Sequence, residues 1–239
     1  IQSVQAHLKE TAVLAKAFAK KLNLELPGEL LGLMHDFGKY SHKFQKYIHD
    51  ETGLFNPDLD DEESTPNGSK VDHSTAGAQW VYRELRKFGA EQGIGELFGQ
   101  MLGLCIASHH GEGLIDCLDG EGNPKWIKRF NKTDELTHLA ECEQNADEVV
   151  QQKAHELAGE NLIRNLLKAV KPILSDSTTN VKIKEFYLGC LTRFLFSCLI
   201  DADRINSSDF EREAQKEVRR LTEKPDWQTA IDQLEAKLA

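Results

Sequence analysis

The sequence has no apolar run long enough to cross a lipid bilayer. Its 239 residues are 40% hydrophobic and 28% charged, and no apolar stretch reaches the roughly 18 residues that a membrane-spanning helix requires. No signal peptide precedes the first predicted helix. This composition is typical of a globular cytoplasmic protein with one sizeable core, or at most two small domains.

Paired cysteines are also missing. The five cysteines are an odd number, and none belongs to a Cys-x-x-Cys pair. Cys105, Cys190 and Cys198 lie inside apolar helical stretches. We therefore expect reduced cysteines in the core of a cytosolic protein.

Net positive charge is absent as well, since the formal net charge is −10. Such acidity argues against a protein that holds nucleic acid chiefly through a basic surface. A phosphate-bearing substrate must then be attracted by a local feature, and bound cations are the obvious candidates. A basic cluster with interleaved aromatic residues at positions 125–132 is able to grip single-stranded nucleic acid, but a solvated surface loop is the favoured interpretation.

Alternating strand patterns are almost absent, and there is no internal repeat. Helical periodicity covers most of the chain instead, which predicts an all-α fold. The predicted helices span residues 3–22, from 27 to the His35-Asp36 pair, 40–50, 71–85, 96–110, two within 134–175, 183–200, 209–222 and 227–238. The helix at 183–200 is apolar nearly all round and should be the central buried one, whereas residues 51–69 should form a loop.

The most informative segment runs from Leu30 to Lys39. His35 and Asp36 end an apolar helical run, and the glycine at position 38 can end or bend a helix. An imidazole and a carboxylate about 100° apart on a helix can converge on one metal ion, or on two ions that the carboxylate bridges. An isolated His-Asp pair more often simply ends a helix, so the other polar residues of the chain decide between these interpretations.

Other histidines and aspartates also lie on inward helix faces or at the ends of apolar helices. The full set of candidate metal ligands is His7, His35, Asp36, His73, His109, His110 and Asp203 or Asp201. Five imidazoles with two carboxylates are too many for one tetrahedral zinc site, whereas two ions that share Asp36 use them all. A pair of ions ~3.5–4 Å apart polarises a phosphodiester and supplies hydroxide near neutral pH.

The order of these residues resembles the HD phosphohydrolase superfamily. The segments MHDFGK, VDHSTAGA, ASHHG and DADR are similar to those of one branch, the HD nuclease domain of the CRISPR-associated Cas3 protein. The resemblance runs from residue 1 to about residue 215. It implies a single all-helical domain with a central buried metal site, which cleaves single-stranded DNA exposed by the guide-RNA surveillance complex (Cascade) in type I CRISPR interference.

The resemblance also implies a partner, because the family's nuclease works beside a Cas3 helicase domain on the same or a separate chain. No G-x-x-x-x-G-K-[ST] phosphate loop occurs in this sequence, so the ATP-driven motor is absent from it. We expect residues 1–220 to form the nuclease domain and residues 221–239 a C-terminal helix or linker toward the helicase. The chain should then be a fragment of a longer protein.

Carried over residue by residue, the resemblance implies two divalent ions of iron, manganese, cobalt or nickel. One ion would be held by His7, His35, Asp36 and the late aspartate, and the other by Asp36, His73, His109 and His110. The superfamily pattern A-D-x-[LI] favours Asp203 as the late aspartate, with Asp201 as the alternative. Lys39 is expected to act in catalysis by contacting a phosphate oxygen or stabilising developing charge, unless it is only a cation at a helix end.

Two competing functions are open. A nucleotide or cyclic-nucleotide phosphohydrolase of the HD type would keep the fold, but it usually needs a closed pocket with base-specific contacts, and the sequence gives no sign of one. A non-catalytic helical adaptor would use the metal ligands only to join helices. A structural site closes with four ligands, however, and this chain offers about seven.

Overall fold

The computed structural model describes residues 2–50, 71–89, 93–111, 113–114, 121–123, 125–221 and 226–238. Every regular element in these ranges is a helix, which confirms the predicted all-α fold. The chain divides into two compact units, residues 1–206 and 207–239. All candidate metal ligands belong to the first unit. The loop predicted at residues 51–69 lies outside the described residues.

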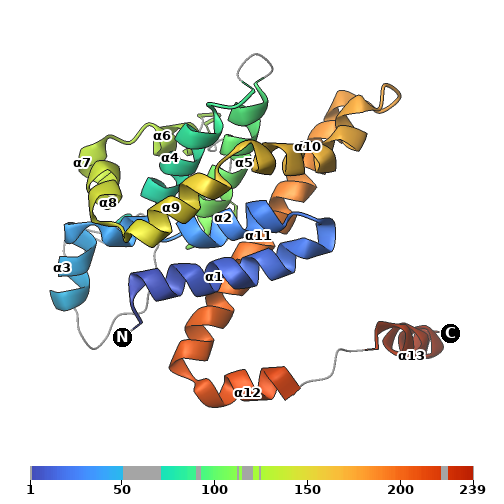
Figure 1. Cartoon of the computed structure of the whole chain (residues 1–239). Coiled ribbons are helices and arrows are strands. Elements are labelled where there is room, and N and C mark those ends of the chain that lie inside the picture. The colour runs from blue at the N-terminus through green and yellow to red at the C-terminus, as the bar shows by residue number, and fades with distance from the viewer. Residues whose placement is uncertain are drawn as a thin grey trace. The chain divides into compact units, whose positions relative to one another are not determined.

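The first two long helices form a packed pair (Figure 1). Helix α1 (Val4–Ala19) begins as predicted at Ser3, whose Oγ accepts a hydrogen bond from the backbone N–H of Ala6 (3.2 Å). A short 3-10 helix η1 (Lys20–Leu22) leads through Asn23, which has a left-handed backbone (φ 56°). Helix α2 (Glu25–Met34) follows and carries the His35-Asp36 pair at its C-terminal end.

Helix α2 lies at the centre of the first unit, where it contacts α1, α4, α5, α9 and α10. The remaining elements of this unit are η2 (Phe37–Tyr40), α3 (His42–Asp50), α4 (Ser74–Leu85), α5 (Ile94–Ser108), α6 (Lys125–Phe130), α7 (Asp134–Thr137), α8 (Leu139–Asn145), α9 (Glu148–Leu157), α10 (Glu160–Ser175) and most of α11 (Val181–Glu211). The core is densest on α2 and α5, the two most hydrophobic helices of the unit. Each of them ends at a pair of candidate ligands.

The prediction that the helix at 183–200 is buried all round is wrong for its first half. In α11, Phe186 is 67% exposed and Tyr187 is 49% exposed. Burial starts only at Leu191, next to the point where the Cys105 thiol of α5 donates to the carbonyl oxygen of Thr192 (3.5 Å). The prediction that Cys190 lies in the core is also wrong. Cys190 is exposed, because it belongs to the part of α11 that precedes the first buried residue, Leu191.

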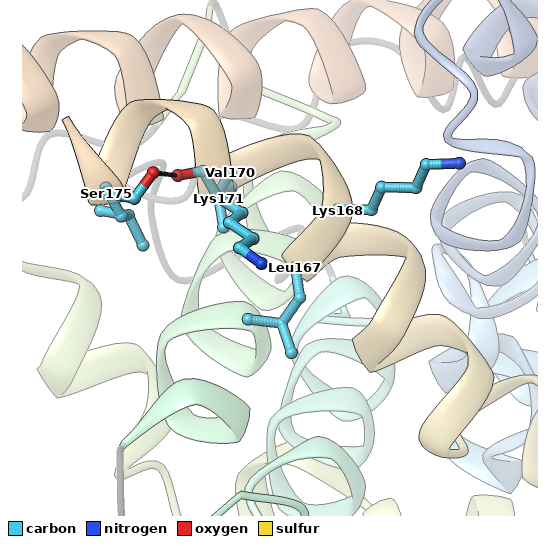
Figure 2. Close-up of a pocket in the computed structure, with 6 residues that line it drawn as sticks. Leu167, Lys168, Val170, Lys171 and Ser175 are labelled. Atoms are coloured by element: carbon cyan, nitrogen blue, oxygen red, sulfur yellow. Dashed lines mark hydrogen bonds between the residues drawn. The ribbon is translucent and has the colours of Figure 1, made fainter.

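An apolar pocket lies along α10 (Figure 2). It is lined by Leu167, Lys168, Val170, Lys171, Leu174 and Ser175. The hydroxyl of Ser175 donates to the carbonyl oxygen of Lys171 (2.7 Å), so that hydroxyl is satisfied within the helix. None of the candidate metal ligands lines this pocket, and it is therefore separate from the centre described below.

The second unit consists of the end of α11 with α12 (Glu213–Leu221) and α13 (Trp227–Leu238). Helix α13 exposes Trp227, Ile231 and Leu234 along one side. The assignment of residues 221–239 to a linker toward a helicase stays a prediction. Across the described part of the chain, no helix has both the length and the apolar composition that a membrane crossing requires.

Gly77→Ala should destabilise the first unit. A Cβ at Gly77 in α4 would lie 1.9 Å from the carbonyl oxygen of Met34 in α2, so the two helices would have to move apart. Overpacking of this kind costs about 1–3 kcal/mol. Thermal unfolding should therefore show a clearly lower Tm for this variant.

Gly189→Ala is the matched control, since Gly189 is also helical but a Cβ there would meet nothing within 4 Å. Alanine at an open helical position should raise stability by up to about 1 kcal/mol. Equal Tm changes in the two variants would contradict the close approach of α2 and α4.

Candidate metal centre

Five separate parts of the chain bring the candidate ligands together. His7 lies on α1, His73 directly precedes α4, and Asp203 lies on α11. The His35-Asp36 and His109-His110 pairs follow the C-terminal ends of α2 and α5. Helix C-termini carry partial negative charge, so these two helices favour cations at this place.

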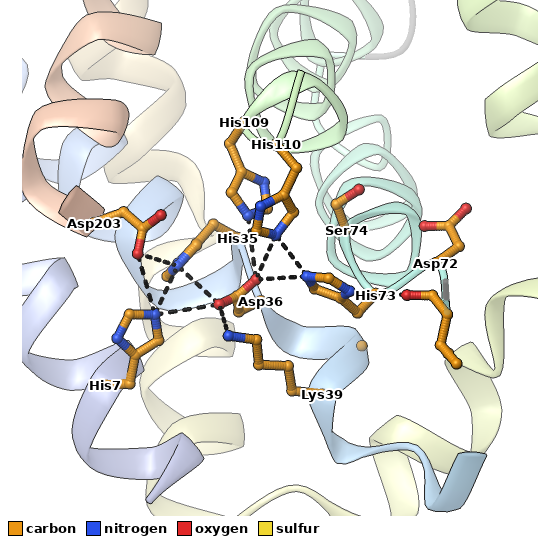
Figure 3. A network of polar contacts seen from close by, with 12 residues as sticks. His7, His35, Asp36, Lys39, Asp72, His73, Ser74, His109, His110 and Asp203 are labelled. Carbon is orange, nitrogen blue, oxygen red and sulfur yellow. Dashed lines mark hydrogen bonds and ion pairs between the residues drawn. The ribbon is translucent and has the colours of Figure 1, made fainter. Parts of the chain in front are cut away.

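The carboxylate of Asp36 lies between two groups of imidazoles (Figure 3). We name His7, His35 and Asp203 cluster 1, and His73, His109 and His110 cluster 2. Asp36 Oδ2 lies 3.2 Å from His7 Nε2 and 3.3 Å from His35 Nε2. Its other oxygen, Oδ1, lies 3.1, 3.3 and 3.5 Å from the Nε2 atoms of His109, His110 and His73.

Asp203 completes cluster 1. Its Oδ1 lies 3.3 Å from His7 Nε2 and 3.5 Å from His35 Nε2, whereas the neighbouring candidate Asp201 is exposed. The ligand atoms of cluster 1 lie within 4.8 Å of one another, and so do those of cluster 2 with Asp36. Either set is therefore able to hold a metal ion.

A close backbone contact fixes the position of His73. The N–H of Gly38 donates to the carbonyl oxygen of His73 (3.0 Å), and a Cβ at Gly38 would lie 2.2 Å from that oxygen. Only glycine allows this approach between η2 and the start of α4. The glycine expected to bend the chain after the His-Asp pair therefore also draws the two clusters together.

Hydrogen bonds on the far side of the rings determine which imidazole nitrogen faces Asp36. The Nδ1 atoms of His35, His73 and His109 lie 2.9, 2.9 and 2.6 Å from the backbone carbonyl oxygens of Gly32, Val71 and Ile106. Because a carbonyl oxygen only accepts, each Nδ1 carries a proton, and a neutral ring then has its lone pair on Nε2. These lone pairs point at a carboxylate, which only accepts. A cation or a proton must lie between them.

The spacing of the donor atoms fits a metal better than a set of direct hydrogen bonds. Two ligands at about 2.1 Å from one ion lie about 3.0–3.4 Å apart in octahedral or tetrahedral geometry. Most distances in cluster 1 fall in this range, including 3.1 Å between the Nε2 atoms of His7 and His35. The Nε2 atoms of His73 and His110 are 2.5 Å apart, so these rings must separate by about 0.5 Å to bind one ion together.

Comparison with known proteins agrees with this geometry. Residues 5–175 match the family described as "Cas3, HD domain", which is well over half of the chain. This chain belongs to the Cas3 HD domain family. A comparison with curated proteins found no match.

Membership of the Cas3 HD family implies a metal-dependent hydrolase of CRISPR systems that uses divalent ions. The match ends at residue 175 and therefore does not include α11. Asp203 is placed in the candidate metal centre by its carboxylate, which lies beside His7 and His35.

Without an ion, the histidines of the HD domain differ in protonation. Burial disfavours every imidazolium, but at His35 the charge of Asp36 and a hydrogen bond to Asp203 outweigh it and raise the pKa to about 10. Burial and the neighbouring His110 lower the pKa of His73 to about 3 and that of His109 to about 4. Neutral imidazole is the metal-binding form, so cluster 2 has two rings ready to bind, whereas His35 must exchange its proton for a cation.

Lys39 lies against the carboxylate of Asp36. Its Nζ is 2.6 Å from Asp36 Oδ2 and 5.8 Å from the centre of the Phe44 ring. Burial raises the pKa of Asp36, but the charges of Lys39 and His35 hold it well below the usual range. The side chain of Lys39 is 17% exposed, whereas that of Asp36 is 1% exposed, so Lys39 lies on the more open side of this carboxylate.

The basic cluster at 125–132 differs from the expected surface loop, because part of it forms α6. Arg129 donates to the hydroxyl groups of Ser74 and Thr75 (both 2.9 Å), and Lys132 Nζ lies 2.6 Å from Asp72 Oδ2. These contacts join α6 to the residues on either side of His73. Phe130 of α6 also packs against Gly103 of α5. This support of the candidate metal centre was not predicted from the sequence.

His42 and His49 lie largely off the apolar stripe of the helix predicted at residues 40–50, which predicts surface positions for both. His42 is there, with a side chain 82% exposed, which confirms the prediction. The side chain of His49 lies outside the described residues. Asn206, a buried residue of α11 that contacts His7, was not among the predicted site residues. A usable signal was its spacing, since Asn206 follows Asp203 by three residues and shares its helix face.

Proposed function

We propose that this HD domain is a nuclease that cleaves single-stranded DNA with two divalent transition-metal ions. The proposal is supported above all by the position of Asp36, whose two carboxylate oxygens face different imidazole clusters. A carboxylate in this position is suited to bridging two ions. Iron, manganese, cobalt and nickel suit such a set of imidazole and carboxylate ligands.

In this proposal each cluster holds one ion. Cluster 1 together with Asp36 would hold the first ion, and cluster 2 together with Asp36 would hold the second. Asp203, rather than Asp201, is the late aspartate ligand, because only Asp203 is close to His7 and His35. When bound, a pair of divalent ions activates water near neutral pH and stabilises the charge of a phosphodiester under attack.

The protein's own residues orient and neutralise the reacting phosphate. Asp36 would be shared by the two ion sites, and Lys39 places a cation beside its Oδ2 atom (2.6 Å). The most exposed side chains of the centre are Lys39 at 17%, Asp203 at 13% and His110 at 12%. We expect the DNA strand to reach the ions past these three residues.

The Cas3 HD family supports a proposal for the substrate and the partners. We propose that the strand is exposed by the guide-RNA surveillance complex (Cascade) in type I CRISPR interference, and that a Cas3 helicase domain on the same or a separate chain feeds it to the site. Residues 1–220 would be the nuclease domain and residues 221–239 the connection to the helicase. The net charge of −10 means that DNA binding without these partners should be weak and salt-sensitive.

An assay with two classes of substrate tests this function. The purified chain, freed of metal and then supplied with Mn²⁺, Co²⁺ or Ni²⁺, is incubated with circular single-stranded DNA and, separately, with a panel of nucleotides and cyclic nucleotides. We expect degradation of the DNA, and no degradation in the presence of EDTA. Hydrolysis of nucleotides alone would instead favour the nucleotide phosphohydrolase.

Lys39→Met should lower the DNA cleavage rate by about 10²-fold, as the removal of one group that stabilises charge in the transition state often does. Metal content should stay at two ions per chain, because Lys39 is not a ligand. Elemental analysis and single-turnover kinetics on the same sample measure both quantities. An unchanged rate would mean that Lys39 is only a cation at the helix end.

A further inference from the structure

His7 is held differently from the other oriented histidines of the two clusters. The Nδ1 atoms of His35, His73 and His109 donate to backbone carbonyl oxygens, which no substitution removes. The Nδ1 of His7 lies 2.7 Å from a side-chain oxygen, Oδ1 of Asn206. The orientation of this ring therefore depends on a replaceable residue.

The orientation of the Asn206 amide is itself determined by its other contacts. Its Nδ2 lies 2.7 Å from Glu10 Oε2, and an ionised carboxylate only accepts hydrogen bonds. The NH₂ group must therefore face Glu10, which leaves the carbonyl oxygen to face His7. Gln2 supports the same orientation, because its Nε2 donates to Glu10 Oε2 (2.9 Å) and to Asn206 Oδ1 (3.2 Å).

Three successive contacts connect Glu10 to the candidate ion site of cluster 1. Glu10 sets the direction of the Asn206 amide, the amide keeps the proton on Nδ1 of His7, and the lone pair of Nε2 then points toward Asp36 and Asp203. With the amide reversed, its NH₂ group would face Nδ1 and favour a proton on Nε2 instead. A proton on Nε2 would occupy the position that an ion needs.

We propose that Asn206, oriented by Glu10, is a positioning residue that holds His7 in the tautomer able to bind the cluster 1 ion. Asn206 is 4% exposed, and it lies one helical turn after Asp203 on α11. One face of α11 thus supplies both a ligand and the support of a second ligand. The inference rests on the proposed function in one respect, namely that His7 is a metal ligand.

The first test uses the protein without metal. In NMR spectra of the ¹⁵N-histidine-labelled chain, we expect Nδ1 of His7 to carry a proton that is protected from exchange with water, whether or not Nε2 is protonated as well. A His7 ring protonated on Nε2 alone would overturn the proposal. This readout depends neither on bound ions nor on activity.

The second test compares Mn²⁺ binding in variants. Asn206→Leu removes the acceptor at similar size, and it should weaken the cluster 1 ion about 10–100-fold, the usual effect of losing a residue that orients a ligand. The cluster 2 ion should keep its affinity. Asn165→Leu is the matched control, because Asn165 of α10 donates to the carbonyl oxygen of Asn23 (2.6 Å), and Mn²⁺ binding should be unchanged.

A paired exchange separates positioning from simple packing. Asn206→Asp alone places two carboxylates together and should weaken the cluster 1 ion. Adding Glu10→Gln restores a donor opposite the new carboxylate and should recover most of the affinity. Unchanged Mn²⁺ binding in Asn206→Leu, or no recovery in the double variant, would overturn the proposal.

These results are distinct from a failure of the nuclease assignment. If Asn206→Leu weakens one Mn²⁺ site but the unmodified chain cuts no DNA, the proposed function fails and the positioning role stands. If the unmodified chain cuts DNA and the variant binds Mn²⁺ normally, only the positioning role fails.

Discussion

Asp36→Ala is expected to abolish DNA cleavage and to remove both ions. The two carboxylate oxygens face different clusters, so a single substitution takes one ligand from each ion. We expect a loss of about 10⁴-fold or more in rate, which corresponds to roughly 5.5 kcal/mol of transition-state stabilisation. Elemental analysis should find far fewer than two ions per chain.

Asp36→Asn controls for packing, because it keeps the size of the side chain and one oxygen. It should leave the helical circular dichroism spectrum intact and still lose most of the activity, since an amide cannot bridge two cations as a carboxylate does. Full cleavage by either variant with metal present would defeat the assignment of Asp36.

Asp203→Ala is expected to have the second largest effect, because it removes the only carboxylate that belongs to cluster 1 alone. The first ion would keep His7, His35 and one oxygen of Asp36, while cluster 2 would keep its full set. We therefore expect about one ion per chain and a loss of cleavage of at least about 10²-fold, because in the proposed function both ions stabilise the attacking and leaving oxygens.

Asp201→Ala is the matched control on the same helix. Asp201 is exposed, so this variant should bind two ions and cleave DNA at the normal rate. Equal losses in the two variants would show that the late ligand cannot be assigned from the position of Asp203, and a loss confined to Asp201→Ala would reverse the assignment.

The helix ends of the metal centre could be predicted from the sequence. An apolar helix that runs directly into His-Asp or His-His places polar side chains beside a buried core, and the structure places both pairs there, after α2 and α5. The inward position of His7 followed from its place on the apolar stripe of α1. In each of these cases local periodicity alone carried the information.

The supporting contacts could not be predicted in the same way. Asn206 and Glu10 lie 196 residues apart in sequence, and no local pattern connects them. The exposure of Phe186 and Tyr187 was missed for a related reason. Their helix is apolar on all sides, so its sequence does not show which turns meet the core and which face solvent.

The basic segment of α6 is a third case. The sequence shows directly that residues 125–132 are basic and aromatic. It does not show the partners of Arg129 and Lys132, which lie more than 50 residues earlier in the chain, beside His73. The charged side chains of this segment therefore partly serve to hold the residues around His73, a candidate metal ligand, in place.

Anomalous diffraction from crystals grown with Mn²⁺ tests the central claim most directly, because it locates each ion relative to Asp36. We predict two peaks ~3.5–4 Å apart, one among His7, His35 and Asp203 and the other among His73, His109 and His110, with one Asp36 oxygen on each. A single peak, or peaks away from Asp36, would contradict the account.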